Sequence, residues 1–348
     1  MHPTDAVLAI TYRCNARCIM CDVWKTTSTS GNELIPEGYK QLPTSLKNIN
    51  ISGGEPFLRN DLPEIIKVIS QRCPNARLVF STNGLSSKLM EKALPGILKI
   101  RPDIAIRFSL DGIDSKHQEM RGIHGAFGKV MSSVNVANAF GVKDVGFAYT
   151  ATNDNLDQLL EVYSFAKRQG MGYSLSGVAH NSAIEGYFGQ TNKEIKDTEL
   201  LRTQINVLLK DRLHTWNLND LARAYQEFGI YYREVYKKRH ISCNAAALHF
   251  YMDPSGNIFS CNVANKYLGN IGEESFETIW NGKKAIEVRA FARHCPHQCW
   301  MICTVSPCIR KRPIRPLWWI LVNKMKAALG REVIKKASDA GVIPAVKA

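Results

Sequence analysis

The first 180 residues alternate between two hydrophobic patterns. Short apolar runs rich in β-branched residues, typical of buried strands, are separated by longer segments with apolar residues at i, i+3 and i+4, typical of amphipathic helices. The apolar runs are 6–12, 49–52, 78–81, 104–110, 145–150 and 173–176, and the helical segments include 62–71, 85–98, 128–140 and 156–169. This alternation predicts a parallel sheet with right-handed crossover helices, curled into a full or partial α/β barrel.

The alternation stops near residue 192. Two helical segments, around 193–213 and 218–238, lead to a cysteine-rich region with a strong hairpin signal, Asp253-Pro254-Ser255-Gly256-Asn257, between apolar runs at 250–252 and 258–260. We therefore expect a barrel over 1–191, a helical linker over 192–240, a small cysteine-rich module over 241–310 and a basic tail over 311–348.

Four polar stretches follow the first four apolar runs. They are Cys14-x3-Cys18-x2-Cys21, Ser52-Gly53-Gly54-Glu55-Pro56, Ser81-Thr82-Asn83-Gly84 and Ser109-Leu110-Asp111-Gly112. The carboxyl ends of barrel strands form one rim, so these stretches should converge there. Three thiolates can hold three corners of an iron–sulfur cluster and leave one iron open. Taken singly, the glycines and small polar residues are more typical of turns than of ligand contacts. The cysteine trio alone is equally typical of a zinc knuckle or a chance cluster.

In this order and at these intervals, the four stretches resemble the signature of the radical S-adenosylmethionine (radical SAM) superfamily. The resemblance implies a partial (β/α)6 TIM-like barrel and a [4Fe-4S] cluster on Cys14, Cys18 and Cys21, whose open iron binds SAM. It implies further SAM contacts from the rim residues Gly53, Gly54, Glu55, Ser81, Asn83, Ser109 and Asp111. Met20 stands where the family usually has an aromatic residue, and as an apolar side chain it suits the adenine side of the site.

The chemistry that this resemblance implies is reductive. An external one-electron donor of the flavodoxin or ferredoxin type would reduce the cluster, SAM would break into methionine and a 5'-deoxyadenosyl radical, and the radical would abstract hydrogen from a substrate.

Six of the ten cysteines lie in the predicted C-terminal module. The unit Cys243-x12-Gly256-x4-Cys261, followed by Cys295, Cys299, Cys303 and Cys308, resembles the SPASM and twitch extensions of radical SAM enzymes, which hold auxiliary [4Fe-4S] clusters. Full SPASM domains have seven or more cysteines at other spacings, so we expect one auxiliary cluster, on Cys243, Cys261 and two of Cys295, Cys299 and Cys303. Zinc suits four cysteines equally well, and His294 or His297 could substitute as ligands. The lone Cys73 is expected to be inert.

Composition favours a globular intracellular protein. Of 348 residues, 45% are hydrophobic, and no apolar run approaches the roughly 20 residues that a membrane-spanning helix needs. No signal peptide is visible before Cys14, so we expect a cytoplasmic protein with reduced thiols.

The formal net charge of +14 is concentrated near the C-terminus. Residues 309–348 contain ten Lys or Arg against two acidic residues, around the apolar run 317–322 with Trp318 and Trp319. This composition predicts an amphipathic helix in the interface of the inner membrane face. The alternative is a helix that packs its Trp face on the barrel. No motif supports binding to nucleic acid.

The tail favours a membrane-associated lipid or cell-surface glycan intermediate as the substrate. The alternative is a peptide-modifying maturase of the SPASM type that acts on ribosomally made peptides. Only thirteen residues precede Cys14, so we expect no peptide-binding domain ahead of the barrel. A zinc-stabilised membrane adaptor is the non-enzyme alternative.

Overall fold

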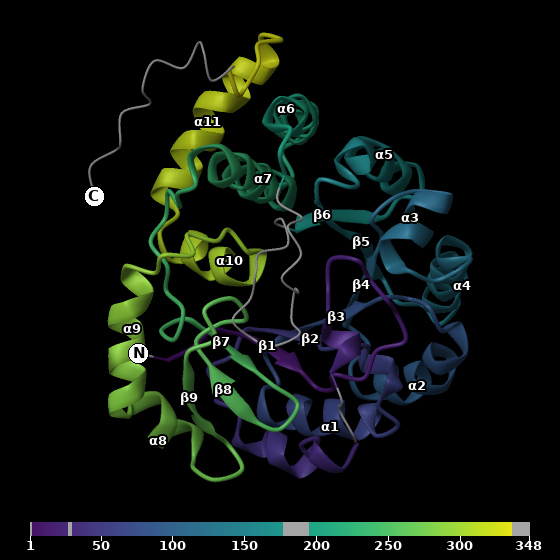
Figure 1. Cartoon of the computed structure of the whole chain (residues 1–348), viewed down its shortest axis with the longest axis vertical. Helices are drawn as coiled ribbons and strands as arrows, with labels where there is room; N and C mark the ends of the chain where they lie inside the picture. The colour runs from purple at the N-terminus through teal and green to yellow at the C-terminus, as the bar shows by residue number, and fades with distance from the viewer. Residues whose placement is uncertain (1, 27–29, 177–194, 336–348) are drawn as a thin grey trace.

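A computed structural model describes residues 2–26, 30–176 and 195–335. Its strands form one nine-stranded sheet in the order β6-β5-β4-β3-β2-β1-β7-β8-β9 (Figure 1). Neighbouring strands among the first six are parallel: β1 (Asp5–Ala9), β2 (Asn48–Ser52), β3 (Arg77–Thr82), β4 (Ala105–Ser109), β5 (Asp144–Thr150) and β6 (Gly172–Ser176). The structure thus confirms the α/β class and all six predicted barrel strands, whose ends differ from the prediction by at most three residues.

Helices on the outside of the partial barrel connect these strands (Figure 1). They are α1 (Leu62–Arg72), α2 (Ser87–Ile100), α3 (Asp114–Arg121), α4 (Ala126–Ala139) and α5 (Leu159–Arg168). The short helix α3 has little apolar periodicity, and the sequence analysis missed it. Its only buried side chains are His117, Met120 and Arg121.

Alternation along β2 separates an apolar outer face from a polar inner face. In β2, Ile49 and Ile51 are fully buried in the main core, whereas Asn50 and Ser52 lie on the opposite face. The Ser81 hydroxyl of β3 donates a hydrogen bond of 3.0 Å to Asn50 Oδ1. The inner face therefore offers polar groups to a ligand, while the helices cover the outer face.

The predicted hairpin forms, but it is continuous with the barrel sheet. Strand β7 (His249–Met252) pairs in parallel with β1. Strand β8 (Asn257–Phe259) pairs antiparallel with β7, and β9 (Tyr267–Asn270) pairs antiparallel with β8. Helices α8 (Phe276–Asn281), α9 (Lys283–Arg293) and α10 (Ile302–Lys311) complete this region. The pairing of β7 with β1 brings the C-terminal cysteines beside the barrel. The predicted domain boundaries stay a prediction.

Both helices expected after residue 192 are present, as α6 (Thr198–His214) and α7 (Leu218–Tyr236). The predicted tail helix is α11 (Ile314–Ala328), which packs against α6 and α7. Expectations for residues 177–194 and 336–348 lie outside the described residues. Within the described part of the chain, no helix is both long and apolar enough to cross a membrane.

Candidate active site

The first cysteine loop leaves β1 and is fixed by backbone hydrogen bonds on two sides. On one side, Gly54 N donates to Thr11 O at 2.7 Å and Glu55 N donates to Arg13 O at 2.8 Å. On the other side, Arg17 N donates to Arg121 O at 2.9 Å, at the end of α3. The loop that carries the thiols is therefore held between the strand β2 rim and α3.

The three thiols and most of the predicted rim contacts line one cavity of about 170 Å³. Its lining includes the sequence-predicted residues Cys14, Cys18, Cys21, Met20, Gly53, Gly54, Ser81, Asn83 and Ser109. Motifs that are up to 95 positions apart in the sequence thus converge at the carboxyl ends of the strands, as the barrel hypothesis requires. Trp24, Arg121 and Thr150 also line the cavity and were not predicted.

Gly53 and Gly54 allow two backbone segments to touch. A Cβ atom at either position would lie 2.2 Å from a backbone carbonyl oxygen, that of Thr11 or Arg13 respectively. Gly53 also has φ of +138°, a conformation that side chains with Cβ rarely adopt. These glycines therefore set the distance between the β2 rim and the chain that enters the cysteine loop.

Glu55 and Asp111 do not line the cavity, although the resemblance implied a SAM contact from each. Glu55 is buried, and its carboxylate accepts hydrogen bonds from Asn83 N (2.7 Å), Thr82 Oγ1 (2.8 Å) and Phe57 N (3.2 Å). Burial raises the pKa of Glu55 to about 7, against the lowering effect of these donors. Glu55 thus joins the second and third rim motifs.

Asp111 acts through Arg121. Its carboxylate accepts a hydrogen bond from Thr150 N and forms an ion pair with Arg121, and both side chains are buried. Burial would lower the pKa of Arg121, but Asp111 and the Cys18 and Cys14 sulfurs raise it, so the guanidinium is charged. The Arg121 Nη1 atom lies 3.4 Å from Cys18 Sγ. No sequence signal marked Arg121, because only the fold brings α3 to the cysteine loop.

The donors around the trio suit negatively charged sulfur. Ala16 N donates to Cys14 Sγ at 3.5 Å, Asn83 Nδ2 lies 3.7 Å from the same sulfur, and Arg121 faces Cys18. Burial raises the pKa of Cys14 to about 12, so its thiol is neutral without a metal, and cluster loading must release its proton. Three thiols on one loop, with donors for the charge they acquire, fit a cluster that the protein holds at three corners.

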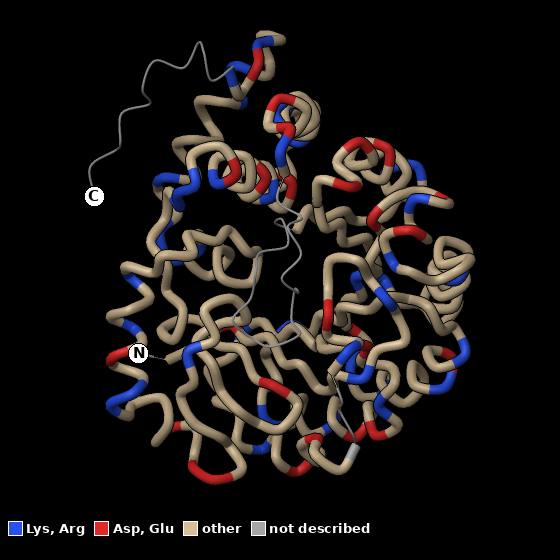
Figure 2. Tube along the Cα trace, viewed as in Figure 1, with Lys and Arg blue, Asp and Glu red and all other residues tan. Residues whose placement is uncertain are grey.

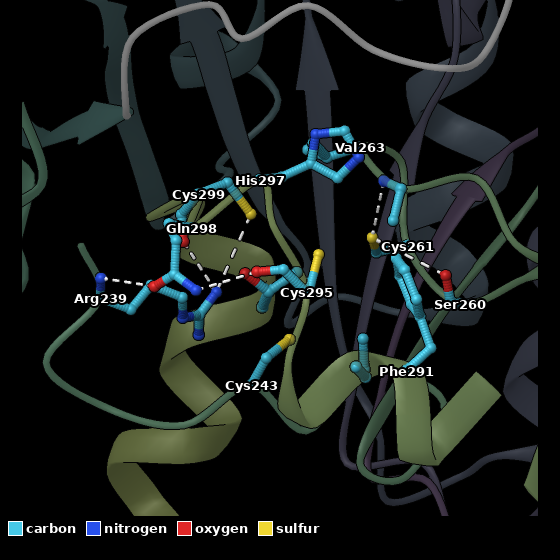
Figure 3. A pocket seen from close by; sticks show the side chains of 14 residues that line it. Arg239, Cys243, Ser260, Cys261, Val263, Phe291, Cys295, His297, Gln298 and Cys299 are labelled. Carbon is cyan, nitrogen blue, oxygen red and sulfur yellow. Dashed lines mark hydrogen bonds between the residues drawn. The ribbon is translucent and has the colours of Figure 1, made fainter. Parts of the chain in front are cut away.

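A second group of thiols lies across the β1–β7 junction. Cys243, Cys261, Cys295 and Cys299 line one pocket, and Figure 3 shows their sulfur atoms around a common space. Arg239 donates to Cys299 O at 2.8 Å and lies 3.9 Å from Cys299 Sγ. Burial raises the pKa of Cys243 to about 12 and of Cys299 to about 11. Four thiols match the number of protein ligands that an Fe–S cluster takes. The neighbouring Arg239 cation suits the negative charge of such ligands.

The remaining cysteines lie outside this pocket. Cys303 is half-buried at the start of α10, with Sγ 3.9 Å from Asn262 Oδ1. It packs both on the apolar cluster of the second thiol group and on the side chains that surround Cys14 and Cys21. The Cys308 thiol donates to Thr304 O at 3.0 Å and accepts from Asn244 Nδ2 at 3.4 Å. The Cys73 thiol is buried and faces Pro43 O at 3.4 Å. His294 is exposed on the surface, and His297 lines the pocket rim.

A zinc ion and an Fe–S cluster make different demands on the thiols that bind them. Among the described residues, no three His, Cys, Asp or Glu side chains converge closely enough to hold one metal ion. A tetrahedral zinc site with Zn–S distances of about 2.3 Å needs sulfurs about 3.8 Å apart. A cubane separates its ligands further, because each thiolate binds a different iron. Zinc therefore needs the thiols of a group to lie closer together than a cluster does.

Two family models match the chain. That of the radical SAM superfamily matches residues 8–166, and that of SPASM, an iron–sulfur cluster-binding domain, matches residues 243–304. The two models therefore cover both thiol groups described above.

Curated relatives span most of the chain. The sporulation killing factor maturation protein SkfB of Bacillus subtilis is 23% identical over 303 residues, 84% of this chain and 68% of the relative. The mycofactocin maturase MftC of Mycolicibacterium smegmatis is 24% identical over 289 residues, 78% of this chain and 68% of the relative. The AdoMet-dependent heme synthase of Methanosarcina barkeri is 22% identical, over 78% of this chain and 80% of that protein.

Solved structures share the fold. The structure of anSMEcpe with bound AdoMet superposes with a TM-score of 0.59 at 13% identity, covering 92% of this chain and all of that one. The structure of Streptococcus suis SuiB bound to S-adenosylmethionine superposes with a TM-score of 0.58 at 15% identity, covering 83% of this chain and 68% of that one. Together with the family matches and the site geometry, these findings identify the chain as an enzyme of the radical SAM superfamily that uses SAM and a [4Fe-4S] cluster and carries a C-terminal SPASM domain for auxiliary Fe–S binding.

Proposed function

We propose that this enzyme cleaves SAM reductively at a [4Fe-4S] cluster held by Cys14, Cys18 and Cys21. The observation that carries the proposal is the single cavity shared by these three thiols and by the rim residues expected to contact SAM. When bound, the cluster and SAM supply a one-electron cleavage that yields methionine and a 5'-deoxyadenosyl radical, which abstracts hydrogen from the substrate. The electron comes from an external donor of the flavodoxin or ferredoxin type.

The residues that line the cavity have different roles in the proposed binding of SAM. Ser81, Asn83 and Ser109 offer hydroxyl and amide groups to the polar parts of SAM, and Gly53 and Gly54 leave the backbone of the β2 rim open to it. Met20 and Trp24 supply apolar surface at the same cavity. This mixture of apolar walls and a few convergent polar groups is typical of a cofactor site.

Arg121 and Asp111 have an electrostatic role in this proposal. The guanidinium next to Cys18 stabilises the thiolate form that a cluster ligand must adopt, because an adjacent cation favours the charged state of a thiol. Asp111 keeps Arg121 in place through their buried ion pair. Glu55 fixes the third rim motif by accepting the backbone N–H of Asn83.

We further propose one auxiliary [4Fe-4S] cluster on Cys243, Cys261, Cys295 and Cys299. The common pocket of these four thiols supports this set over one that includes Cys303. Arg239 at Cys299 has the same role as Arg121 at Cys18, since each places a cation beside a ligand sulfur. Zinc remains the alternative metal, and iron content and absorbance distinguish the two.

For the substrate, we propose a peptide. The relatives SkfB and MftC are named as a maturation protein and a maturase, and they match more than three quarters of the chain. These matches favour the peptide-modifying alternative over the lipid or glycan hypothesis, which rests on the basic tail alone. A cytoplasmic location is the corresponding expectation.

The test compares wild type with Cys18→Ala and, as a matched control, Cys73→Ala. Each protein is reconstituted anaerobically, reduced with dithionite and given SAM with the peptide or the lipid fraction of host cells. We expect wild type and Cys73→Ala to form 5'-deoxyadenosine, more with the peptide fraction, and Cys18→Ala to form none. Cleavage retained by Cys18→Ala would refute the cluster assignment. Stimulation by lipid alone would refute the peptide substrate.

A further inference from the structure

Helix α11 has two apolar faces, and only one of them is packed against the part of the chain that the structure describes. On the packed face, the Trp319 ring stacks on Phe228 at 4.7 Å and meets Tyr225 edge-on at 5.4 Å. Pro316 and Ala327 on the same face are buried. This face packs the helix against α6 and α7.

The opposite face exposes a continuous apolar stripe. It consists of Ile314, Leu317, Trp318, Leu321 and Met325, which are 80%, 59%, 68%, 52% and 56% exposed. These positions follow i, i+3, i+4, i+7 and i+11, so at about 100° per residue they share one side of the helix. Single exposed apolar residues are ordinary, but five on one helix face form an unpartnered surface.

The connection between α6 and α7 extends this surface. The Lys324 ammonium donates to Leu213 O and Thr215 O, both at 2.6 Å, and lies 4.2 Å from the centre of the Trp216 ring. Trp216 is 81% exposed and Leu218 is 79% exposed. Two tryptophans, Trp216 and Trp318, therefore stand on the outside of the same corner of the molecule.

The surroundings of the stripe are positively charged. Residues 309–331 include seven Lys or Arg and no Asp or Glu. Figure 2 shows Lys and Arg gathered where α10 passes into α11. Arg310 is paired with Asp5, whereas the exposed Lys311 and Arg312 have no ion pair among the residues that the structure describes. A partner that binds this surface must therefore offer an apolar region for the stripe and negative charge for the surrounding Lys and Arg.

We propose that α11 docks the enzyme onto a lipid bilayer that contains anionic lipids. In this arrangement the stripe enters the interface between headgroups and acyl chains, Trp318 and Trp216 lie at headgroup depth, and the flanking cations contact lipid phosphates. A second copy of the chain is a poorer occupant, because two such helices would bring their positive charges together. The proposal is independent of the peptide substrate and of the cluster chemistry.

The test is flotation of the reconstituted full chain with vesicles of phosphatidylcholine alone or mixed with phosphatidylglycerol. We expect binding to the mixed vesicles, weaker binding at high salt, and at least about tenfold weaker partitioning for Trp318→Glu. The matched control is Phe140→Glu, since Phe140 is 42% exposed at the end of α4 and lies outside the stripe. This control should bind like wild type.

Three outcomes would overturn the proposal. One is the absence of binding to anionic vesicles, and another is equal binding by Trp318→Glu and wild type. The third is a dimer, seen by light scattering, that Trp318→Glu dissociates without any vesicle binding. Unchanged melting temperatures verify that both variants fold, as expected for substitutions at exposed positions.

Discussion

Gly54→Ala tests whether the contact between the β2 rim and the cysteine loop controls the chemistry. The added Cβ would lie 2.2 Å from Arg13 O and 2.7 Å from Tyr12 O, whereas ordinary contacts are 3.4–4 Å. The two segments must therefore separate by about 1 Å, since the neighbours are backbone atoms that cannot rotate away. Cys14, the first residue of the cysteine loop, directly follows Arg13, so this separation displaces Cys14.

The expected loss of stability in Gly54→Ala follows from two effects. Overpacking of this kind costs about 1–3 kcal/mol. The hydrogen bonds from Gly54 N to Thr11 O and from Glu55 N to Arg13 O weaken as the segments part, at about 1 kcal/mol each. We expect a loss of about 2–4 kcal/mol in the free energy of unfolding, and a rate of SAM cleavage lowered about 100-fold, because a 1 Å misplacement has that effect on a reacting group.

The assay is formation of 5'-deoxyadenosine by anaerobically reconstituted protein under dithionite, beside iron content and thermal unfolding. Gly128→Ala is the matched control, because Gly128 lies inside α4 and its added Cβ would meet nothing within 4 Å. This control should be slightly more stable, by about 0.5–1 kcal/mol, and fully active. If Gly54→Ala melts like Gly128→Ala and cleaves SAM within twofold of the wild-type rate, the contact between the β2 rim and the cysteine loop does not control the chemistry.

Three further predictions concern other parts of the molecule. Cys261→Ala should bind about four of about eight iron atoms and still cleave SAM, and full iron content would exclude Cys261 as a ligand. Gly229→Ala should lower stability by about 1–3 kcal/mol in denaturant titration, because its Cβ would lie 2.0 Å from the Trp300 ring, and an unchanged midpoint would contradict this. Burial would raise the pKa of Asp144, but Arg77 and Arg107 lower it below the ordinary 3.8. The ionised Asp144 carboxylate therefore stabilises the fold above pH 3.8, and this stabilisation is lost as the pH falls further. The difference in melting temperature between wild type and Asp144→Asn should therefore disappear in acid. A difference that stays constant with pH would count against the ion pairing of Asp144.

The barrel could be read from the sequence because its signals are local. Each strand is a short apolar run, and each covering helix repeats its apolar residues within a few turns. The rim motifs follow these runs directly, so the general rule for parallel strands was enough to predict that Cys14, Gly53, Asn83 and Ser109 meet. The hairpin at Asp253 was equally local, since its turn residues mark it.

Long-range contacts were beyond such reasoning. Arg121 reaches Cys18 only because α3 packs against the cysteine loop, and α3 lacks the apolar period that would have revealed it. The indirect position of Glu55, behind Asn83 and Thr82, likewise depends on how two rim loops stack. Pairing of β7 with β1 joins segments more than 240 residues apart, which no local pattern encodes.

The sequence by itself determined the chemistry of this protein, because cysteine spacing, glycines and strand-end polar residues are covalently adjacent to the elements that position them. Tertiary structure alone decided which thiols share a pocket, which favours Cys295 and Cys299 over Cys303. It also decided that Trp319 packs inward while its neighbour Trp318 remains exposed. A helix with apolar residues on both sides carries no signal of which side meets the core, since that choice depends on the shape of the surface against which it packs.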